Sequence, residues 1–588
     1  MHNKLGDFTS TPRMITISGM AVFIGLVSAF VAVALLKLIG LFTNLFFFGR
    51  WNAALVSPAG NHLGWMEILV PVAGALIIGA MARYGSERIR GHGIPEAIEA
   101  ILIGGSRIEP KVAILKPLSS ALSIGTGGPF GAEGPIIMTG GAFGSMIAQL
   151  FKLTSNERKT LLVAGAAGGM AATFAAPVAS VLLAVELLLF EWKPRSLVPV
   201  ALASVTAAAA RCYIIGLGPL FPVPAHPVFV GPPALLACLL VGLAAGGLSA
   251  LLTLAVYGAE DLFRMLPIHW MWWPAIGGLA IGLGGLIFPQ ALGVGYETIG
   301  ALLQGDVPLK MIVGILLVKS AIWAISLGSG TSGGVLAPLL MMGGALGGIE
   351  AMFLPHEGAG FWPLVSMGAI LGGTMRSPFT GVIFALELTH DVNMLLPLLL
   401  AVTVAHGFTV LTLRRSILTE KVARRGYHLS REYAVDPLEI LFVREVMRTN
   451  VAAIPARLTG RELARALHTD HTVRHGQQLY PVVDEEQRLV GVVTRGDLEL
   501  YAKGGAELKY RDPVVAYPDE PLRMVVYRMS DTGLTRFPVV NNDRERKLEG
   551  MVALSDLLRA RTQSLEQERH RERVLRIHLP MRIRRPVA

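Results

Sequence analysis

The 588-residue chain is 52% hydrophobic and only 16% charged, and its mean hydropathy is +0.54. Soluble globular proteins carry about 25% charged residues, so this composition excludes that class and predicts a protein that crosses a membrane several times. The 66 glycines suit close packing of membrane helices, and the 35 prolines predict many short or broken helices. The net charge of +10 gathers after Arg414 and at the C-terminus, which favours a cytoplasmic location for both regions.

The apolar part of the chain runs from residue 15 to residue 426, after a polar arm at residues 1–14 that we expect on the cytoplasmic side. Clear spans are predicted at 15–48, 66–82, 234–257, 276–288 with its flanks, and 395–413. Other apolar segments are short, among them 111–124, 176–189 and 365–373. Segments of fewer than about 17 residues cannot cross a bilayer alone as straight helices. They predict broken or re-entrant helices around a cavity enclosed by protein.

The chain changes character after a charged linker at residues 427–442, because no later segment is apolar over a membrane length. Residues 443–502 and 508–562 each contain a strand, a turn, a second strand and a helix that begins near Asp497 or Asp556. The repeated segments are LYPVVDEEQRLVGVVTRGDLE and RFPVVNNDRERKLEGMVALSDLL. We predict a separate soluble region of two related modules, followed by a basic tail at residues 563–588.

The membrane region also repeats itself. EGPIIMTGGAFGSMIAQLF matches LAPLLMMGGALGGIEAMF, and APVASVLLAVE matches SPFTGVIFALE. Pro338 follows Pro135 by 203 residues, and Pro378 follows Pro177 by 201 residues. Two ordered matches at nearly constant offset predict two related halves, the usual plan of a transporter or channel whose site lies where the halves meet.

Three glycine- and proline-rich segments are candidates for an anion site: GHGIPEAIEAI, GPFGAEGPIIM and GSGTSGGVLAPLL. Glycine allows close approach to the backbone, and a helix that begins at such a segment presents free N–H groups to an anion. None contains Lys or Arg, which favours an anion that is bound by dipoles and leaves again. The alternative for each segment is a simple helix break. The candidate backbone positions are Gly93, Ile94, Pro95, Gly134 and Gly334.

Glu133 is the one carboxylate of the glycine- and proline-rich run GTGGPFGAEGP, at a depth where a charge costs a few kcal/mol. The three segments resemble, in order and spacing, the signature segments of the CLC chloride channels and transporters. KSAIWAISLGSGTSGG, RSPFTGVIFALELT and SILTEKVARRG are also similar to CLC segments, and the soluble modules resemble a CBS pair. The resemblance implies an all-α polytopic membrane protein of two inverted repeats with many short and broken helices, a soluble α/β CBS pair, and chloride transport.

The resemblance also implies roles for particular residues. Glu133 matches the gating glutamate, whose carboxylate occupies the outer anion site, swings out when protonated and, in exchangers, carries the proton. The backbone amides of Val335 and Leu336 match those that hold the central anion. His92 falls where the family usually has Ser, or Pro in nitrate-preferring members. Its ring either donates an N–H group to the anion or fills space as a neutral group bonded to a carbonyl.

Departures from the family pattern concern the same pathway. Leu418 stands where most members have a tyrosine whose hydroxyl binds the central anion, which weakens the inner coordination or leaves it to His92. Ala132 replaces the usual Arg or Lys beside the gating glutamate. Leu187 stands where many exchangers have an internal proton-transfer glutamate, next to Glu186. The resemblance leaves two functions open, a channel and a chloride/proton antiporter. Leu187 and Leu418 favour weakly coupled or uncoupled transport.

Other charged residues of the apolar region have two interpretations. Lys116 and Lys319 either add positive potential near the pathway or extend to an interface. Glu186 and Glu387 occupy equivalent repeat positions, and we expect them to hold backbone or Arg groups, with Arg376 as one candidate.

The soluble modules contain the patterns Gly491-x-x-Thr494-x-x-Asp497 and Gly550-x-x-Ala553-x-x-Asp556. These resemble the CBS segment whose Thr and Asp hold a nucleotide ribose, so an adenine nucleotide is a possible ligand at Thr494, Asp497 and Asp556. Many CBS pairs bind nothing and serve as dimer contacts.

Two rival functions stay open from the sequence: a CLC-type transporter of nitrate or fluoride, and a membrane enzyme regulated through its CBS pair. The membrane region has no HExxH motif and no His/Cys cluster, so we expect neither catalytic nor metal-ligating residues, and no certain cofactor. We expect a homodimer in the lipid bilayer of a bacterial inner membrane, with cytoplasmic CBS modules, chloride and protons as partners, and no nucleic acid.

Overall fold

The computed structural model describes residues 12–102, 104–305, 307–425, 438, 441–457, 477–502, 510–541 and 546–569. Contacts divide the chain into two compact units, residues 1–431 and 432–588, which we describe one at a time. Most of the predicted N-terminal arm, of the linker at 427–442 and of the basic tail at 563–588 lies outside the described residues.

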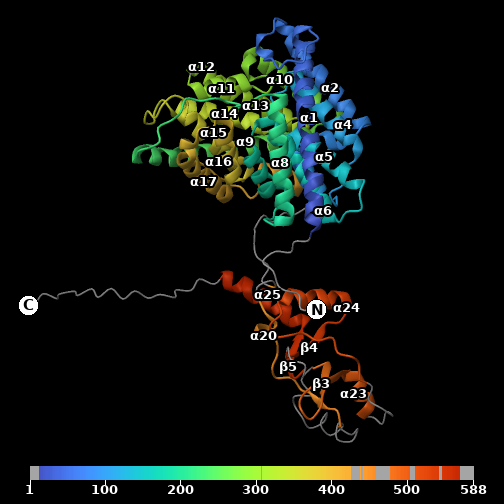
Figure 1. Cartoon of the computed structure of the whole chain (residues 1–588). Coiled ribbons are helices and arrows are strands. Elements are labelled where there is room, and N and C mark those ends of the chain that lie inside the picture. Colours follow the sequence, from blue (N-terminus) through green and yellow to red (C-terminus); the bar gives the residue numbers. More distant parts are fainter. Residues whose placement is uncertain are drawn as a thin grey trace, which may run out of the picture. The chain divides into compact units, whose positions relative to one another are not determined.

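The membrane unit is a bundle of helices that forms two series of similar length and order (Figure 1). The first series is α1 (Arg13–Phe48), α2 (Leu69–Tyr84), α3 (Ile94–Leu102), α4 (Pro110–Gly125), α5 (Glu133–Gln149), α6 (Ser155–Phe174), α7 (Pro177–Leu183) with the π-helical η4 (Ala184–Leu189), and α8 (Pro194–Ile214). The second series is α9 (Pro232–Met265), α10 (Trp273–Ile287), α11 (Tyr296–Gln304), α12 (Leu309–Gly314) with the π-helical η7 (Ile315–Lys319) and α13 (Ser320–Gly328), α14 (Leu336–Glu350), α15 (Phe361–Met375), α16 (Pro378–Thr389) and α17 (Leu395–Thr412).

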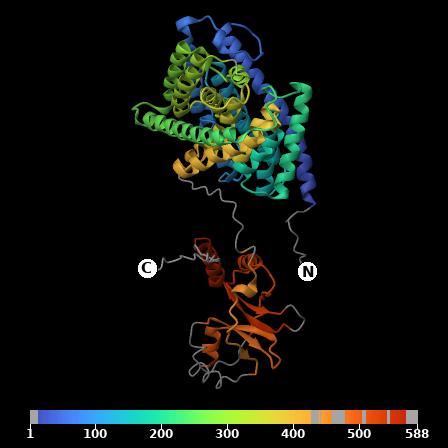
Figure 2. The same ribbon diagram turned by 90° about the vertical axis from the view of Figure 1, so that its left-hand side faces the viewer.

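The helix α18 (Ile417–Arg424) completes the membrane unit. Short 3-10 turns connect the main helices: η1 (Pro58–Gly60), η2 (Gly64–Ile68), η3 (Glu87–Ile89), η5 (Trp270–Trp272), η6 (Pro289–Ala291) and η8 (Val392–Met394). The predicted repeat is visible in the matching order, because α3, α5 and α7 of the first series correspond to α11, α14 and α16 of the second. Both views show α1 and α8 side by side (Figure 1, Figure 2).

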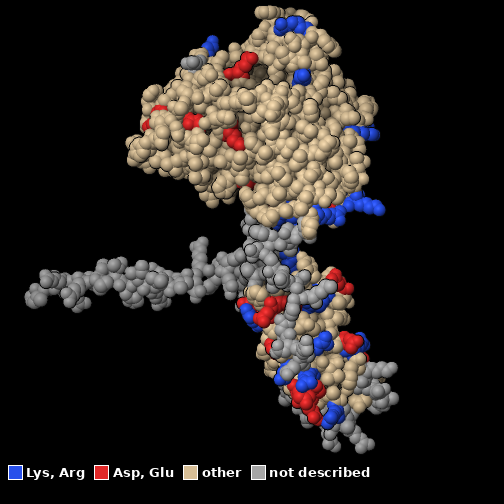
Figure 3. Space-filling model, viewed as in Figure 1, with Lys and Arg blue, Asp and Glu red and all other residues tan. Residues whose placement is uncertain are grey.

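Seven helical segments of the described chain are long and apolar enough to cross a membrane: Arg13–Phe48, Gly64–Tyr84, Pro194–Ile214, Pro232–Met265, Trp270–Ile287, Leu309–Gly328 and Val392–Arg424. Five of them contain the spans predicted from the sequence, whereas the sequence had not distinguished 194–214 and 309–328. The helices predicted to be too short for a span are α4, α7 with η4, and α15. The visible face of this unit is almost free of charged side chains (Figure 3), as a lipid-facing surface requires.

Small residues position α5 against α6. A methyl group on Gly140 of α5 would overlap the carbonyl oxygen of Gly165 in α6, and a methyl group on Gly165 would overlap the carbonyl of Gly140. Backbones approach this closely only where neither residue has a side chain. The contact holds α5 in place, and with it the helix N-terminus that begins at Glu133.

Two glutamates connect the halves of the membrane unit reciprocally. Glu387 of α16 accepts hydrogen bonds from the amides of Val178 (2.9 Å) and Ala179 (2.8 Å) in the first turn of α7. Glu186, which follows α7, accepts from the amides of Phe379 (3.3 Å) and Thr380 (2.9 Å) in the first turn of α16. Each carboxylate thus neutralises free N–H groups at the start of the opposite helix.

The expectation that these glutamates hold backbone groups agrees with these bonds. Arg376, which the sequence suggested as a partner, donates to the carbonyl oxygens of Thr409 (2.8 Å) and Leu413 (2.5 Å). Its guanidinium therefore caps the C-terminal end of α17, where carbonyl groups lack helical partners.

The soluble unit contains two similar modules, as the internal repeat predicts. In the first, β1 (Ile454–Pro455) pairs parallel to β2 (Leu479–Val483), which pairs antiparallel to β3 (Leu489–Thr494) ahead of α23 (Arg495–Ala502). In the second, β4 (Arg536–Val540) pairs antiparallel to β5 (Leu548–Ala553). The remaining helices are α20 (Val443–Val446), α24 (Leu522–Thr532) and α25 (Leu554–Arg569). Buried Tyr480 and Phe537 occupy equivalent places in the two cores.

We predict that Glu387→Ala lowers the free energy of unfolding by about 1–3 kcal/mol, because two amides at the start of α7 lose their acceptor. The thermal unfolding midpoint in detergent measures this effect. Glu297, exposed in the first turn of α11, provides the control: Glu297→Ala should leave the midpoint nearly unchanged. Equal midpoints for both variants would contradict a structural role for the reciprocal contacts.

Candidate functional site

Three glycine-rich loops meet where α5 and α14 begin. The amide of Gly131 donates to the carbonyl of Gly334 at 3.2 Å, and the amide of Gly334 donates to the carbonyl of Gly131 at 2.9 Å. A second bridge joins Gly91 to Ser332. The predicted segments therefore come together, and the N-termini of helices from both halves point into one place.

The carboxylate of Glu133 lies at this meeting point and is fully buried. Neither of its oxygens has a hydrogen-bond partner among the residues that the structure describes. The backbone amides of Glu133 itself and of Ala337, together with the ammonium of Lys319, favour a negative charge on this carboxylate. The carboxylate also lies against Gly131 and Gly334, where any side chain would overlap it or crowd it. It occupies the kind of site that helix N-termini offer to an anion.

The other predicted positions line or support the same place. Val335 and Leu336 are buried where α14 begins, and Gly134 follows Glu133 in the first turn of α5. Gly134 packs directly on the carbonyl of His92, which a methyl group there would overlap. The loop of Gly93 is thereby fixed against α5.

His92, Gly93, Ile94 and Pro95 form the loop and first turn ahead of α3. The amide of Gly93 donates to Oε2 of Glu96 at 2.9 Å. The side chain of His92 is 3% exposed, and its Nδ1 has no hydrogen-bond partner in the described structure. Nδ1 therefore bonds to no carbonyl of the described residues, and both interpretations of the His92 ring stay predictions.

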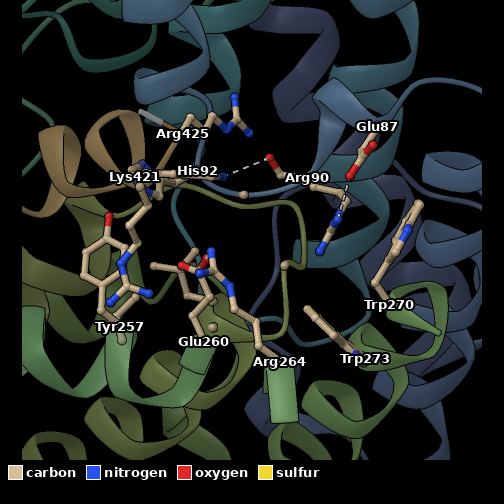
Figure 4. Close-up of a pocket in the computed structure, with 16 residues that line it drawn as sticks. Glu87, Arg90, His92, Tyr257, Glu260, Arg264, Trp270, Trp273, Lys421 and Arg425 are labelled. Atoms are coloured by element: carbon tan, nitrogen blue, oxygen red, sulfur yellow. Dashed lines mark hydrogen bonds and ion pairs between the residues drawn. The ribbon is translucent and has the colours of Figure 1, made fainter. Parts of the chain in front are cut away.

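A cavity of about 290 Å³ opens beside this loop (Figure 4). We call it the His92 cavity, and its lining includes Glu87, Arg90, Gly91, His92, Tyr257, Glu260, Arg264, Trp270, Trp273, Lys421, Arg424 and Arg425. The guanidinium of Arg90 lies 4.4 Å from the ring centre of Trp270. Cations from α9, α18 and the α3 loop thus surround one entrance to the glycine loops.

Lys116 and Lys319 are both completely buried, so the interpretation that they extend to an interface is wrong. Nζ of Lys116 donates to the carbonyls of Ile89 (2.9 Å) and Gly91 (2.7 Å). Nζ of Lys319 donates to the carbonyls of Ala291 (3.2 Å) and Gly293 (3.0 Å). Each ammonium is held by carbonyl oxygens, which satisfy its donors and remove the reason to reach water.

The two lysines reveal a third repeat that the sequence analysis missed. Lys319 follows Lys116 by 203 residues, the offset of Pro135 and Pro338. The segment GHGIPE corresponds to GVGYET, and the two glycines of each have positive φ, with values of 81° and 89° in the first copy and 64° and 82° in the second. This constant offset could have identified Tyr296 and Lys319 from the sequence alone. Both side chains interact electrostatically with Glu133.

Leu418 and Leu187 are buried apolar residues, as the sequence predicts for positions without a hydroxyl or carboxyl group. Tyr257 in α9 has a hydroxyl that bonds to the residue before Leu418. It donates to the carbonyl of Ile417 at 2.5 Å. Tyr257 also lines the His92 cavity, but its hydroxyl is engaged in this hydrogen bond to α18.

The two CBS positions differ in the soluble unit. Asp497 accepts from the hydroxyl (2.6 Å) and amide (3.0 Å) of Thr494, and these bonds hold the pKa of the Asp497 carboxyl below its usual range. A cavity of about 490 Å³ beside Thr494 also contacts Arg495, Thr535 and Arg536.

Asp556 in the second module is 4% exposed and already paired. Its Oδ1 accepts from Nη2 of Arg448 at 2.7 Å, and its Oδ2 accepts from the amide of Ala553 at 3.0 Å. The two predicted CBS positions differ in how tightly they are paired, because Arg448 lies 2.7 Å from Asp556 whereas Arg511 lies 3.6 Å from Asp497. A cavity of about 310 Å³ also lies beside Asp556.

Comparison with known proteins identifies the family. The family model described as "Voltage gated chloride channel" matches residues 73–410, and the CBS domain model matches residues 443–503 and 506–562. This chain belongs to the voltage-gated chloride channel family, which confirms the resemblance and the fold class inferred from the sequence.

Individual relatives are consistent with this assignment. A ClcB-like chloride channel protein of Ralstonia nicotianae is 31% identical over 363 residues, covering 60% of this chain and 84% of that protein. The H(+)/Cl(-) exchange transporter ClcA of Yersinia pestis is 30% identical over 357 residues, covering 57% and 72%. The crystal structure of a slow cyanobacterial Cl-/H+ antiporter superimposes with a TM-score of 0.62 at 21% identity, covering 71% of this chain and 99% of that one, which supports the fold.

We predict that Gly134→Ala abolishes or strongly reduces chloride flux in liposomes, because the added methyl group pushes the His92 loop away from the start of α5. Gly247→Ala provides the matched control, since open space surrounds that glycine in α9. Wild-type flux in the Gly134 variant would show that the close approach of the two loops is not needed.

Proposed function

We propose that this protein transports chloride across a membrane through a pathway that passes Glu133. The observation that carries the proposal is the buried, unpaired carboxylate of Glu133 where α5 and α14 begin. Helix N-termini favour a negative charge there, and a chloride ion replaces the carboxylate without changing the net charge. Relatives named as a chloride channel and a chloride exchanger support the same substrate and support transport over an enzymatic role. We therefore favour chloride over nitrate or fluoride.

Transport is coupled loosely to protons in this proposal. A carboxylate that alternates with an anion must leave the site or bind a proton, because two negative charges so close together repel strongly. Leu187 is a fully buried apolar residue and Glu186 is committed to the amides at the start of α16. The expected internal proton acceptor is absent from this position, so proton delivery to Glu133 depends on another route, which favours an imperfect coupling ratio.

We also propose a homodimer in a bacterial inner membrane, with the soluble unit on the cytoplasmic side. Basic residues gather at the end of the membrane unit where α1 begins and α18 ends, among them Arg13, Lys152, Arg158, Arg415 and Arg425. Such residues favour the cytoplasmic side. Exposed apolar side chains on α8 and α17, such as Val205 and Leu399, provide a surface for lipid or for a second copy.

We predict that Glu133→Ala retains chloride flux and loses proton movement, because it removes the carboxyl that carries the proton. Chloride efflux from liposomes, recorded together with external pH, measures both quantities. Wild-type protein should take up protons as chloride leaves, at a ratio that varies with the gradient because coupling is loose. Glu549→Ala, at an exposed position of β5 in the soluble unit, should behave as the wild type.

Each alternative outcome has a definite meaning. Wild-type chloride flux without proton movement would replace the exchanger by a channel or uniporter. The absence of chloride flux in the wild type would contradict the chloride assignment, and the same assay with nitrate and fluoride would then identify the anion.

We propose that an adenine nucleotide binds the soluble unit in the cavity beside Thr494. Thr494 lines a cavity of about 490 Å³ together with Arg495 and Arg536, whose guanidinium groups suit phosphate. The Thr494 hydroxyl donates to Asp497 and has a lone pair for a ligand donor. A second cavity, of about 310 Å³, lies beside Asp556, whose carboxylate is paired with Arg448. Because the second module has Ala553 in place of the threonine, we expect the first nucleotide to bind beside Thr494.

We predict that Thr494→Val weakens adenine nucleotide binding about three- to tenfold, the usual worth of one hydrogen bond. Isothermal titration of the full-length protein with ATP, ADP and AMP measures the change. Thr532→Val, at an exposed site whose hydroxyl donates within its own helix, is the control. Unchanged affinity in the Thr494 variant, or no heat with any nucleotide, would contradict this site.

A further inference from the structure

Lys421 of α18 lines the His92 cavity. The residues that its ammonium group contacts, Glu96 and Arg90, lie more than 300 positions earlier in the sequence. Nζ of Lys421 lies 2.6 Å from Oε1 of Glu96 and 3.5 Å from the carbonyl oxygen of Arg90 (Figure 4). It also lies over the Cα atom of Gly91, where any side chain would overlap it. The ammonium is therefore immediately beside the loop that contains His92.

The carboxylates around Lys421 do not fully neutralise the positive charge of its ammonium group and of the cations beside it. Oε1 of Glu96 forms an ion pair with the ammonium, and Oε2 accepts a hydrogen bond from the amide of Gly93. Arg425 approaches the same carboxylate at 3.9 Å and also pairs with Glu99. Together with buried Lys116, which also acts on Glu96, three cations face two carboxylates at this loop. The excess positive charge attracts an anion to the cavity.

The other carboxylates of the cavity are engaged by arginines. Glu87 pairs with Arg90 at 3.0 Å, and Glu260 pairs with Arg264 at 2.5 Å. Neither therefore opposes an anion near Lys421 with a free negative charge. These pairs come from η3 and α9, on the other walls of the cavity.

His92 supplies an independent observation at the same place. His92 is one of the residues that line the cavity, is 3% exposed, and has no hydrogen-bond partner at its buried Nδ1 in the described structure. A buried polar atom without a partner is costly. A bound anion that accepts an N–H bond from this ring removes that cost.

The hydroxyl groups that could serve an anion here are absent or occupied. Leu418 has none, and the hydroxyl of Tyr257 donates to the carbonyl of Ile417 at 2.5 Å. The four arginines of the cavity lining, Arg90, Arg264, Arg424 and Arg425, are each paired with a carboxylate. The donors beside the Gly91 loop are the ammonium of Lys421 and the ring of His92. Both are nitrogen donors, and one is a full cation.

We propose that Lys421 is a specificity-determining residue that binds a small monovalent anion in the His92 cavity, together with the His92 ring. The site takes the place of the hydroxyl coordination that Leu418 lacks. This inference rests on the proposed chloride transport and adds a residue to it. Because Lys421 also pairs with Glu96, the strength of anion binding is set by the balance between these two charges.

The test measures chloride binding by isothermal titration of the purified full-length protein, and chloride flux separately in liposomes. Lys421→Met should raise the dissociation constant about tenfold, the effect of one nearby charge at the effective dielectric of a partly buried site. Lys421→Arg keeps the charge and should restore most of the affinity. Arg415→Met is the control, because Arg415 is half exposed on the loop before α18 and outside the cavity lining.

Glu96→Gln distinguishes an electrostatic role from a structural one. Glutamine keeps an oxygen for the Gly93 amide while it releases the ammonium from its counter-charge, so chloride should bind about threefold more tightly. A purely structural ion pair predicts weaker binding for both single variants. If Lys421→Met misfolds because Glu96 is left buried and unpaired, the double variant Glu96→Gln/Lys421→Met restores charge balance and reports the loss of Lys421.

The outcomes separate this inference from the proposed function. Unchanged chloride affinity in the Lys421→Met or double variant, or weaker binding in Glu96→Gln, would overturn the assignment of Lys421. Chloride binding that depends on Lys421 without any wild-type flux would support the site and reject the proposed transport.

Discussion

The structure depends on the burial of one carboxylate, Glu133, where helices from both halves begin. A charge at membrane depth costs a few kcal/mol at least, and no hydrogen bond from the described residues offsets this cost. Helix N-termini and the buried ammonium of Lys319 provide the compensating positive potential. Such a site needs backbones that approach without side chains between them, which explains the glycines on each loop and the close contact of α5 with α6.

The two halves are related but not equivalent, and the differences lie at the pathway. Lys116 and Lys319 hold corresponding loops through two carbonyl groups each. The first loop borders a cavity of about 290 Å³ with several cations, whereas its counterpart borders one of about 80 Å³. A transporter must present different surfaces at its two ends, and the repeat supplies a common scaffold on which a few side chains create this difference.

The soluble unit repeats this pattern of a shared scaffold with unequal sites. Both hairpins have the same register, and Tyr480 and Phe537 fill equivalent cores. Thr494 borders a cavity of about 490 Å³, while Asp556 is paired with Arg448 beside a cavity of about 310 Å³. The two modules thus share a scaffold, but Ala553 takes the place of the threonine in the second module, so the two cavities offer different groups to a ligand.

The sequence by itself determined the membrane class, the two halves, the soluble modules and the glycine loops around Glu133, because hydropathy, repeat offset and glycine spacing are local properties of the chain. It did not determine which charges meet. The burial of Lys116 and Lys319, the crossed contacts of Glu186 and Glu387, and the pairing of Lys421 with Glu96 join residues far apart in the sequence. Only the packing of the helices decides such contacts, since the partner of a buried charge is whichever group the fold places within a few ångströms.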